Sequence, residues 1–189
     1  MRIKILSATA LLLTAQFALA QSSVDPLDTR IFKNGLWLGG GVGWTDLESE
    51  SAGSQISDNS FGYNLGVGYQ FLNYFGVSAR WRDLGEFTDS VAGQSVTVDV
   101  DGYTLGVSAG YPITERIAVN AGLGYFDFDF DDSLAGSGGN EDSGGYFSAG
   151  LSSEIGNIVV QPMVVVYDTD LADLWTLELN FYWKLELGN

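Results

Sequence analysis

Residues 60–72 read SFGYNLGVGYQFL, an almost unbroken alternation of large apolar side chains with small or polar ones. Because successive side chains of a β-strand point to opposite faces, this alternation predicts a strand. The opposite face carries Gly, Asn and Gln rather than the Lys, Glu and Thr that usually cover a soluble sheet. Such a strand suits a sheet with its large apolar face outside and a narrow, wet interior. The large face is formed by Phe61, Tyr63, Leu65, Val67, Tyr69 and Phe71.

The first twenty residues have the features of an export signal. Arg2 and Lys4 precede a short apolar run, and Ala18-Leu19-Ala20 supplies a small-residue cleavage site. The run is too short for a transmembrane helix, and no later stretch approaches the roughly 20 apolar residues that a helical span needs. We therefore expect a cleaved signal peptide over residues 1–20, with a buried N-terminal helix as the alternative.

The composition excludes several function classes. The chain has no Cys and no His, so disulfides, Cys nucleophiles, His-based catalytic dyads or triads and His/Cys metal sites are all excluded. The formal net charge of −16 argues against a nucleic-acid partner, because phosphate binding requires a basic surface. The 25 Gly and the 13% aromatic content are unusual for a soluble core but fit a strand-rich barrel.

The same alternation recurs, and eight strands can be identified in all. Short turns are predicted after Phe71, after Tyr111 and at Gly156-Asn157. Long polar connections are predicted over residues 47–59, 83–94, 131–143 and 168–173. The phase of the apolar residues breaks twice, at Val96-x-Val98-x-Val100 and at residues 126–130. A bulge, or the end of the membrane zone with the strands continuing beyond it as a ribbon, explains both breaks.

These features predict an all-β fold, an eight-stranded antiparallel up-and-down transmembrane β-barrel. Lipid cannot hydrogen-bond a backbone, so a spanning sheet must close on itself. Most of the 24 acidic residues lie in the long connections and their margins, which contain no Lys or Arg. The short turns are then expected on the periplasmic side and the acidic loops outside. The alternative is a secreted β-sandwich or a lipocalin-like barrel.

The pattern resembles the small eight-stranded outer-membrane β-barrels of the OmpA-like transmembrane-domain superfamily, most closely over residues 61–85. The resemblance covers about residues 34–187 and implies architecture rather than activity. We expect a short periplasmic N-terminal segment over residues 21–33 and the outer-membrane β-barrel domain over residues 34–189. We expect no peptidoglycan-binding domain after the barrel, so the wall-anchoring role of larger relatives is not implied. The terminal aromatic that such barrels often carry is absent, so recognition by the barrel-insertion machinery is expected to use Trp183, Leu185 and Leu187.

Five charged side chains are predicted to point into the lumen. A charge in so narrow a barrel must find an opposite charge or water. We therefore expect an ion-pair network that plugs the lumen, and the alternative is a gate in which an arginine changes acidic partners. The predicted network comprises Arg80, Arg82, Glu154, Glu178 and Lys184; the predicted lipid-facing residues are Phe61, Tyr63, Leu65, Val67, Tyr69, Phe71, Trp81, Phe181 and Trp183.

Two other patterns carry little chemistry. Asp127, Asp129, Asp131 and Asp132 resemble the opening of a calcium loop, but Gly at the sixth position and Glu at the twelfth are missing. They remain weak divalent-cation candidates on a solvated acidic loop. The glycines of residues 39–43 have no helix N-terminus after them to hold a phosphate, and they are predicted to make room in the lumen.

The sequence therefore predicts a non-enzymatic outer-membrane protein of the Gram-negative envelope, without cofactor, metal or catalytic residues. Its expected role is structural or in surface interaction, with outer-membrane lipid and lipopolysaccharide around it and a surface ligand on the acidic loops. A monomer is expected. The alternative function is porin-like transport, through a narrow pore or a conduit for small molecules.

Overall fold

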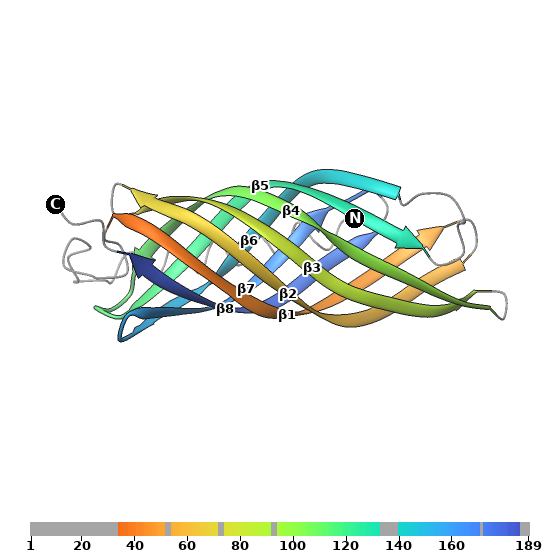
Figure 1. Ribbon diagram of the computed structural model, residues 1–189, viewed down its shortest axis with the longest axis horizontal. Helices are drawn as coiled ribbons and strands as arrows, with labels where there is room; N and C mark the ends of the chain where they lie inside the picture. The colour runs from red at the N-terminus through yellow and green to blue at the C-terminus, as the bar shows by residue number, and fades with distance from the viewer. Residues whose placement is uncertain are drawn as a thin grey trace.

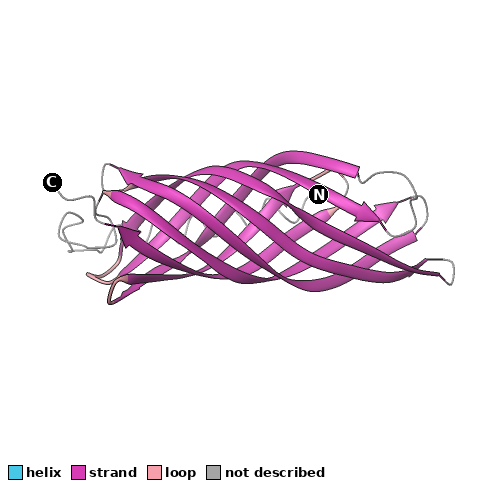
Figure 2. Ribbon diagram, viewed as in Figure 1, coloured by secondary structure: helices cyan, strands magenta, loops and turns pink. Residues whose placement is uncertain are grey.

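A computed structural model describes residues 34–51, 54–71, 74–91, 94–132, 140–170 and 172–185. The predicted signal peptide and N-terminal segment lie outside the described residues. Eight antiparallel strands close into a barrel, with each strand paired to its sequence neighbours and β1 paired to β8 (Figures 1 and 2). The predicted fold class is confirmed. The strands are β1 (Gly35–Ser51), β2 (Ser54–Phe71), β3 (Phe75–Val91), β4 (Gln94–Pro112), β5 (Ile117–Asp132), β6 (Asn140–Ile155), β7 (Ile158–Asp168) and β8 (Asp173–Leu185). No helix among the described residues is long and apolar enough to cross a membrane.

The three predicted short turns all lie at one end of the barrel, which we call the turn end. Residues 72–74 join β2 to β3, residues 113–116 join β4 to β5, and Gly156-Asn157 joins β6 to β7. Gly156 has a φ of 67°, a left-handed conformation that glycine adopts without a steric cost. β8 also ends at the turn end (Figure 1).

At the opposite, far end, the predicted long connections over residues 47–59 and 83–94 are wrong, and the one over residues 131–143 is too long, because strands occupy both of its ends. The predicted connection over residues 168–173 agrees with the end of β7 at Asp168 and the start of β8 at Asp173. The β1–β2 ladder continues to the pair Ser51–Ser54, and the β3–β4 ladder to Val91–Gln94. The hairpin of β3 and β4 extends furthest from the turn end (Figure 1). β5 and β6 also pair as far as Phe130 and Asn140. These acidic segments form strands because their acids alternate with Val, Ile or Phe, which is an amphipathic strand pattern.

Toward the turn end, the large apolar side chains lie on the outside of the barrel. Phe61 is 79% exposed on this face. Every predicted lipid-facing residue lies on it; Phe71 and Trp81 are half-buried there, and the others are exposed. On most strands this outer apolar surface ends in an aromatic residue followed two positions further on by Asp or Asn. Such pairs are Trp44 and Asp46, Phe61 and Asn59, Trp81 and Asp83, Tyr103 and Asp101, Tyr125 and Asp127, and Trp175 and Asp173.

Beyond this boundary the apolar side chains move to the inside. Val100, Phe126 and Phe128 are almost completely buried within the barrel, while Asp99 and Asp127 are exposed outside. The β4–β5 ladder runs without a register shift, so the predicted phase breaks are exchanges of face and not bulges. The far-end core consists of Leu47, Leu84, Phe87, Val100, Phe126, Phe128, Phe130, Met163, Val165, Tyr167 and Leu174.

The register does shift in β3, between Asp83 and Gly85. Leu84 is the extra residue, and both it and Phe87 point inward and are buried. Gly85 has a φ of 87° and donates its backbone N–H to Asp83 Oδ1 at 2.9 Å. The bulge requires this left-handed glycine, and it allows β3 to turn both Leu84 and Phe87 into the far-end core.

Candidate functional site

A row of interior positions crosses four strands near the middle of the barrel. Arg82 of β3 is opposite Asn64 of β2, which is opposite Gly41 of β1, which is opposite Asn180 of β8. A Cβ at Gly41 would collide with the side-chain oxygen of Asn180. The glycine therefore lets the two amides meet above it, and Asn64 Nδ2 donates to Asn180 Oδ1 at 2.9 Å. This close approach agrees with the prediction that the glycines of residues 39–43 make room in the lumen.

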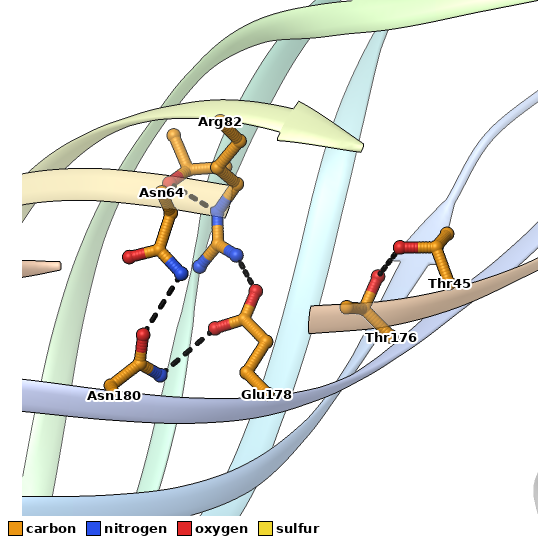
Figure 3. A network of polar contacts seen from close by, with 7 residues as sticks. Thr45, Asn64, Arg82, Thr176, Glu178 and Asn180 are labelled. Atoms are coloured by element: carbon orange, nitrogen blue, oxygen red, sulfur yellow. Dashed lines mark hydrogen bonds and ion pairs between the residues drawn. The ribbon is translucent and has the colours of Figure 1, made fainter. Parts of the chain in front are cut away.

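A buried ion pair completes this layer. The guanidinium of Arg82 contacts the carboxylate of Glu178, and the two side chains are each about 2% exposed (Figure 3). Arg82 Nε donates to Thr104 Oγ1 at 3.1 Å, and Asn180 Nδ2 donates to Glu178 Oε2 at 3.0 Å. Because the two buried charges contact each other and also bond to the neutral Thr104 and Asn180 side chains, the layer can hold an ion pair away from bulk water. We call these residues, with Asn64, the Arg82 layer.

On the far side of this layer the lumen is filled first by two threonines and then by aliphatic and aromatic side chains. The hydroxyls of Thr45 and Thr176 lie 3.1 Å apart, both buried (Figure 3). Beyond them the ring of Tyr167 packs edge-on against Phe126 and Phe128, with centroids at 5.5 and 5.1 Å. The guanidinium of Arg82 lies 6.0 Å from the Tyr167 ring. The Arg82 layer is thus backed by the far-end core.

On the turn-end side of the layer the lumen is hollow and polar. A cavity of about 110 Å³ is lined by Gly, Ser and Asn from β3 to β6. Its lining also includes Trp37 of β1, Arg80 of β3, and Tyr182 and Lys184 of β8. The lining reaches the turn end of the barrel, because it includes Gln70, next to the last residue of β2, and Tyr74, which precedes β3. The lumen therefore has a polar chamber at the turn end.

Arg80 is held in this chamber by aromatic rings. Its guanidinium carbon lies 5.3 Å from the Trp37 ring and 5.1 Å from the Tyr182 ring, within the range of cation–π attraction. A Cβ at Gly68 would collide with the Trp37 ring, so that glycine leaves the ring its place. Within the described part of the chain, no carboxylate forms an ion pair with Arg80.

The structure therefore brings together only part of the predicted ion network. Arg82 and Glu178 form the pair, and Arg80 lies against rings. Lys184 lies at the turn end, where its Nζ donates to Gln70 Oε1 at 3.4 Å. Glu154 is half-buried near the same end, in register with Val159.

Sequence reasoning missed the neutral members of the Arg82 layer. Asn64 and Asn180 complete its hydrogen bonds, and Thr104 accepts from Arg82. One feature of the sequence could have indicated them. Asn64 and Asn180 each occupy the inward-facing phase of a predicted strand. An amide there must find a polar partner inside the lumen.

The candidate cation ligands are far from one another. Asp127, Asp129 and Asp131 are exposed on the outside of β5, where alternate side chains are about 7 Å apart along the strand. No cluster of metal-binding side chains occurs among the described residues. Asp132 belongs to the same strand. The geometry is that of a solvated acidic surface.

That surface continues on β3 and β4, where several acids are adjacent. Asp83 is opposite Asp101, and Glu86 is opposite Asp99. Partial burial, followed by repulsion from Asp83, Glu86 and Asp101, raises the pKa of Asp99 above its usual range. The outside of the far end therefore carries a dense negative charge.

Solved structures with the same fold are outer-membrane proteins. The Ail attachment invasion locus protein of Yersinia pestis, solved with the heparin analogue sucrose octasulfate, is 18% identical with a TM-score of 0.55, over 81% of this chain and 100% of that one. Neisserial surface protein A is 12% identical with a TM-score of 0.59, over 80% and 97%. OprG of Pseudomonas aeruginosa is 13% identical with a TM-score of 0.58, over 80% and 96%. These likenesses establish the fold.

No curated protein matches the sequence significantly. A family model does match, and it covers residues 6–185, nearly the whole chain. The description of this family, an outer membrane protein beta-barrel domain, agrees with the closed barrel described above. The chain belongs to the outer membrane protein beta-barrel domain family, and its place is the bacterial outer membrane.

Proposed function

We propose that the protein is a non-enzymatic outer-membrane barrel with a closed lumen, which presents its acidic far end to the exterior for surface interaction. The observation that carries this proposal is the layered lumen, in which the Arg82 layer is backed by the far-end core. In this orientation the turn end is periplasmic, as expected when an exported N-terminus and an even number of strands place both chain ends there.

The interior argues for closure. An eight-stranded barrel is only wide enough for its own side chains. Here Arg82, Phe126 and Val165 are each at most 1% exposed. An ion crossing the far-end core would lose its hydration among hydrocarbon side chains, at a cost of many kcal/mol. The buried Arg82–Glu178 pair adds a second barrier.

The exterior argues for interaction by charge. Asp127, Asp129 and Asp131 project from one strand, and Asp83 and Asp101 are neighbours on two others. A polyanion such as the sulfated sugar bound to the Ail protein would be repelled by this surface. We therefore expect a cationic partner on the far end. Binding to an immobilised lysine-rich peptide should weaken in the triple variant Asp127→Asn, Asp129→Asn, Asp131→Asn, while binding to heparin should be absent from both proteins.

The absence of His and Cys supports a non-enzymatic role, because it removes the nucleophiles, bases and soft metal ligands on which most hydrolytic sites depend. The buried carboxylate of the layer, Glu178, accepts a hydrogen bond from the Asn180 amide and pairs with Arg82. Such an arrangement holds structure together.

Planar-bilayer recording of the purified, refolded protein tests the closed lumen. We expect no discrete conductance steps from the unmodified chain. Removing both the ion pair and a ring, in the variant Arg82→Ala, Glu178→Ala, Phe128→Ala, should introduce steps if the barrel still folds. Regular steps from the unmodified protein that change in Arg82→Ala would instead support the alternative, a narrow pore gated by interior Arg and Glu.

A further inference from the structure

The sheet is open between β2 and β3 at the far end. The β2–β3 ladder ends at the pair Tyr63–Asp83. Beyond that pair β2 continues in register with β1, and β3 continues in register with β4. In the described part of the chain, residues 54–62 of β2 and residues 85–91 of β3 therefore pair with a strand on one side only.

This opening widens from the bulge of β3 toward the tip of the β3–β4 hairpin. Gly85 lies directly against β2, because a Cβ at this glycine would collide with the backbone of Phe61. Three residues further on, one side chain separates the two strands, and the Asp58 carboxylate accepts a hydrogen bond from the backbone N–H of Thr88 at 2.6 Å. The β3–β4 hairpin then extends past the end of β2 (Figure 1). A bulge bends and twists its strand, which explains the divergence.

The open edge of β3 presents backbone groups that a new strand could use. The N–H of Thr88 points into the opening, since it bonds to Asp58 of β2. Alternate residues of a strand direct their N–H and C=O groups to the same side, so those of Glu86 and Ser90 face the opening as well. The bond to Asp58 is exposed to solvent, so the carbonyl oxygen of an incoming strand can replace that carboxylate. An open edge of this kind is a template for pairing with another chain.

The side chains beside this edge select the strand that can be added. On the outer face Glu86 is exposed and lies opposite Asp99, and on the inner face Phe87 is completely buried. The described far-end segments beyond the Arg82 layer contain no Lys or Arg. Across neighbouring strands opposite charges attract and like charges repel. The edge therefore fits a strand that alternates basic residues outside with apolar residues inside, and it repels a second copy of itself.

We propose that the open edge of β3, residues 86–91, is a docking site for an extended cationic segment of a partner protein, which adds to the β3–β4 sheet as a further strand. This proposal rests on the proposed function, because it names the form of the cationic partner that the acidic far end binds. Main-chain hydrogen bonds to β3 supply affinity, and basic side chains beside Glu86 supply specificity. Docking displaces Asp58 from the N–H of Thr88.

Fluorescence anisotropy with a labelled peptide of alternating Lys and Val tests this site, using the full chain refolded in a zwitterionic detergent. Methylation of the peptide's backbone nitrogens keeps its charge and removes its hydrogen-bond donors. We expect methylation to weaken binding about tenfold or more, because several bonds to β3 are lost. A peptide with the same residues in two blocks, all Lys and then all Val, should bind about as weakly as the methylated one. A peptide of alternating Glu and Val should not bind.

Two substitutions at one position of the edge form a matched pair. Thr88→Pro removes the N–H that faces the opening, and proline is tolerated on edge strands. Thr88→Val keeps this N–H and removes only the hydroxyl, which lies 3.3 Å from that of Thr97. Thr88→Pro should weaken binding of the Lys-Val peptide about tenfold, and Thr88→Val should leave the affinity unchanged. Folding of both variants is checked by the change in electrophoretic mobility on heating.

Hydrogen–deuterium exchange locates the bound peptide and does not depend on either variant. The unmethylated Lys-Val peptide should slow exchange of the backbone amides in residues 86–91 and leave that of β7 unchanged. No slowing there, or equal affinities for the methylated and unmethylated peptides, would overturn the added strand and leave the charged surface of the proposed function in place. If no lysine peptide binds at all, the proposed function fails together with this site.

Discussion

The two ends of this barrel use the same ladder of strands and place their apolar side chains on opposite faces. Toward the turn end, Leu65 and Phe181 lie outside and the interior is lined by Gly and Ser. At the far end, Phe126 and Phe128 lie inside and acids cover the outside. The first arrangement suits hydrocarbon around the barrel, and the second suits water around it.

This difference marks the level along the barrel at which the membrane ends. On β5 the outward residue Tyr125 is followed by the outward residue Asp127, while Gly124 inside is followed by Phe126 inside. Within two residues along the strand, the outer face changes from aromatic to acidic and the inner face changes from glycine to phenylalanine. The backbone pairing continues unchanged across this step, so the surrounding solvent, and not the strand geometry, decides which face is apolar.

The largest expected effect comes from the Arg82 layer, which lies between the two regions. Glu178→Ala leaves the Arg82 charge buried without a partner, and we expect a loss of about 3 to 5 kcal/mol in unfolding free energy. The double variant Arg82→Met, Glu178→Met should recover most of it, because no charge then remains buried. Urea unfolding in lipid vesicles measures both. A double variant as unstable as the single one would show that the layer stabilises the barrel by more than mutual neutralisation.

The second prediction compares one substitution in the two regions. Phe128→Ala should cost about 3 to 5 kcal/mol, because it leaves a cavity in the far-end core. Phe181→Ala should cost about 1.5 to 3 kcal/mol, because lipid chains fill the space that the ring leaves. The same unfolding experiment checks the pair. A larger loss at Phe181 would contradict the assignment of a packed core to the far end.

The third prediction reverses the test by adding charge to the outer face. Leu65→Arg should cost about 2 to 4 kcal/mol near the middle of the membrane. Glu86→Arg, on the exposed face of β3 beyond the boundary, should change the stability by no more than about 0.5 kcal/mol. The loss of heat-modifiable folding in vesicles reports the first effect. If Leu65→Arg folded as well as Glu86→Arg, the outer face at Leu65 would not be in lipid.

The smallest effect is a pH dependence of the far end. The pKa of Asp99 is raised by partial burial and by the neighbouring acids Asp83, Glu86 and Asp101. The folded state therefore binds this proton more tightly than the unfolded state, so stability rises as the pH falls through the raised pKa and decreases as the pH rises through it. Asp99→Asn should flatten that part of the profile, with changes within about 0.5 kcal/mol. A steeper profile in the variant would contradict the assignment.

Much of the fold follows from the alternation alone. The period of two assigns the outward face of residues 61–71, as the structure has it. The far ends of the strands are harder to predict from the sequence. Asp alternating with Phe or Val has the same period of two, but there the apolar face points into the lumen and the acidic face points to water. The sequence pattern predicts loops for these acids, whereas the structure places most of them on strands.

The pairing inside the lumen could not be predicted in the same way. Arg82 and Glu178 belong to β3 and β8, which are not neighbours in the sheet. Their contact depends on the stagger of all the strands between them, and on Gly41, which lets Asn64 and Asn180 approach. A sequence shows which side chains point inward but not at which height each one lies.

The lumen that we propose has a wet chamber at the turn end, closed off from a dry core at the far end. The chain contains no Cys, so a single introduced cysteine is the only thiol. Ser108→Cys, exposed to the cavity, and Val165→Cys, 0% exposed in the far-end core, should be treated with a small water-soluble thiol reagent in reconstituted vesicles. We predict rapid labelling of the cysteine at 108 and none at 165 until the barrel is unfolded. Labelling of the folded barrel at 165, at a rate near that at 108, would contradict the closed lumen.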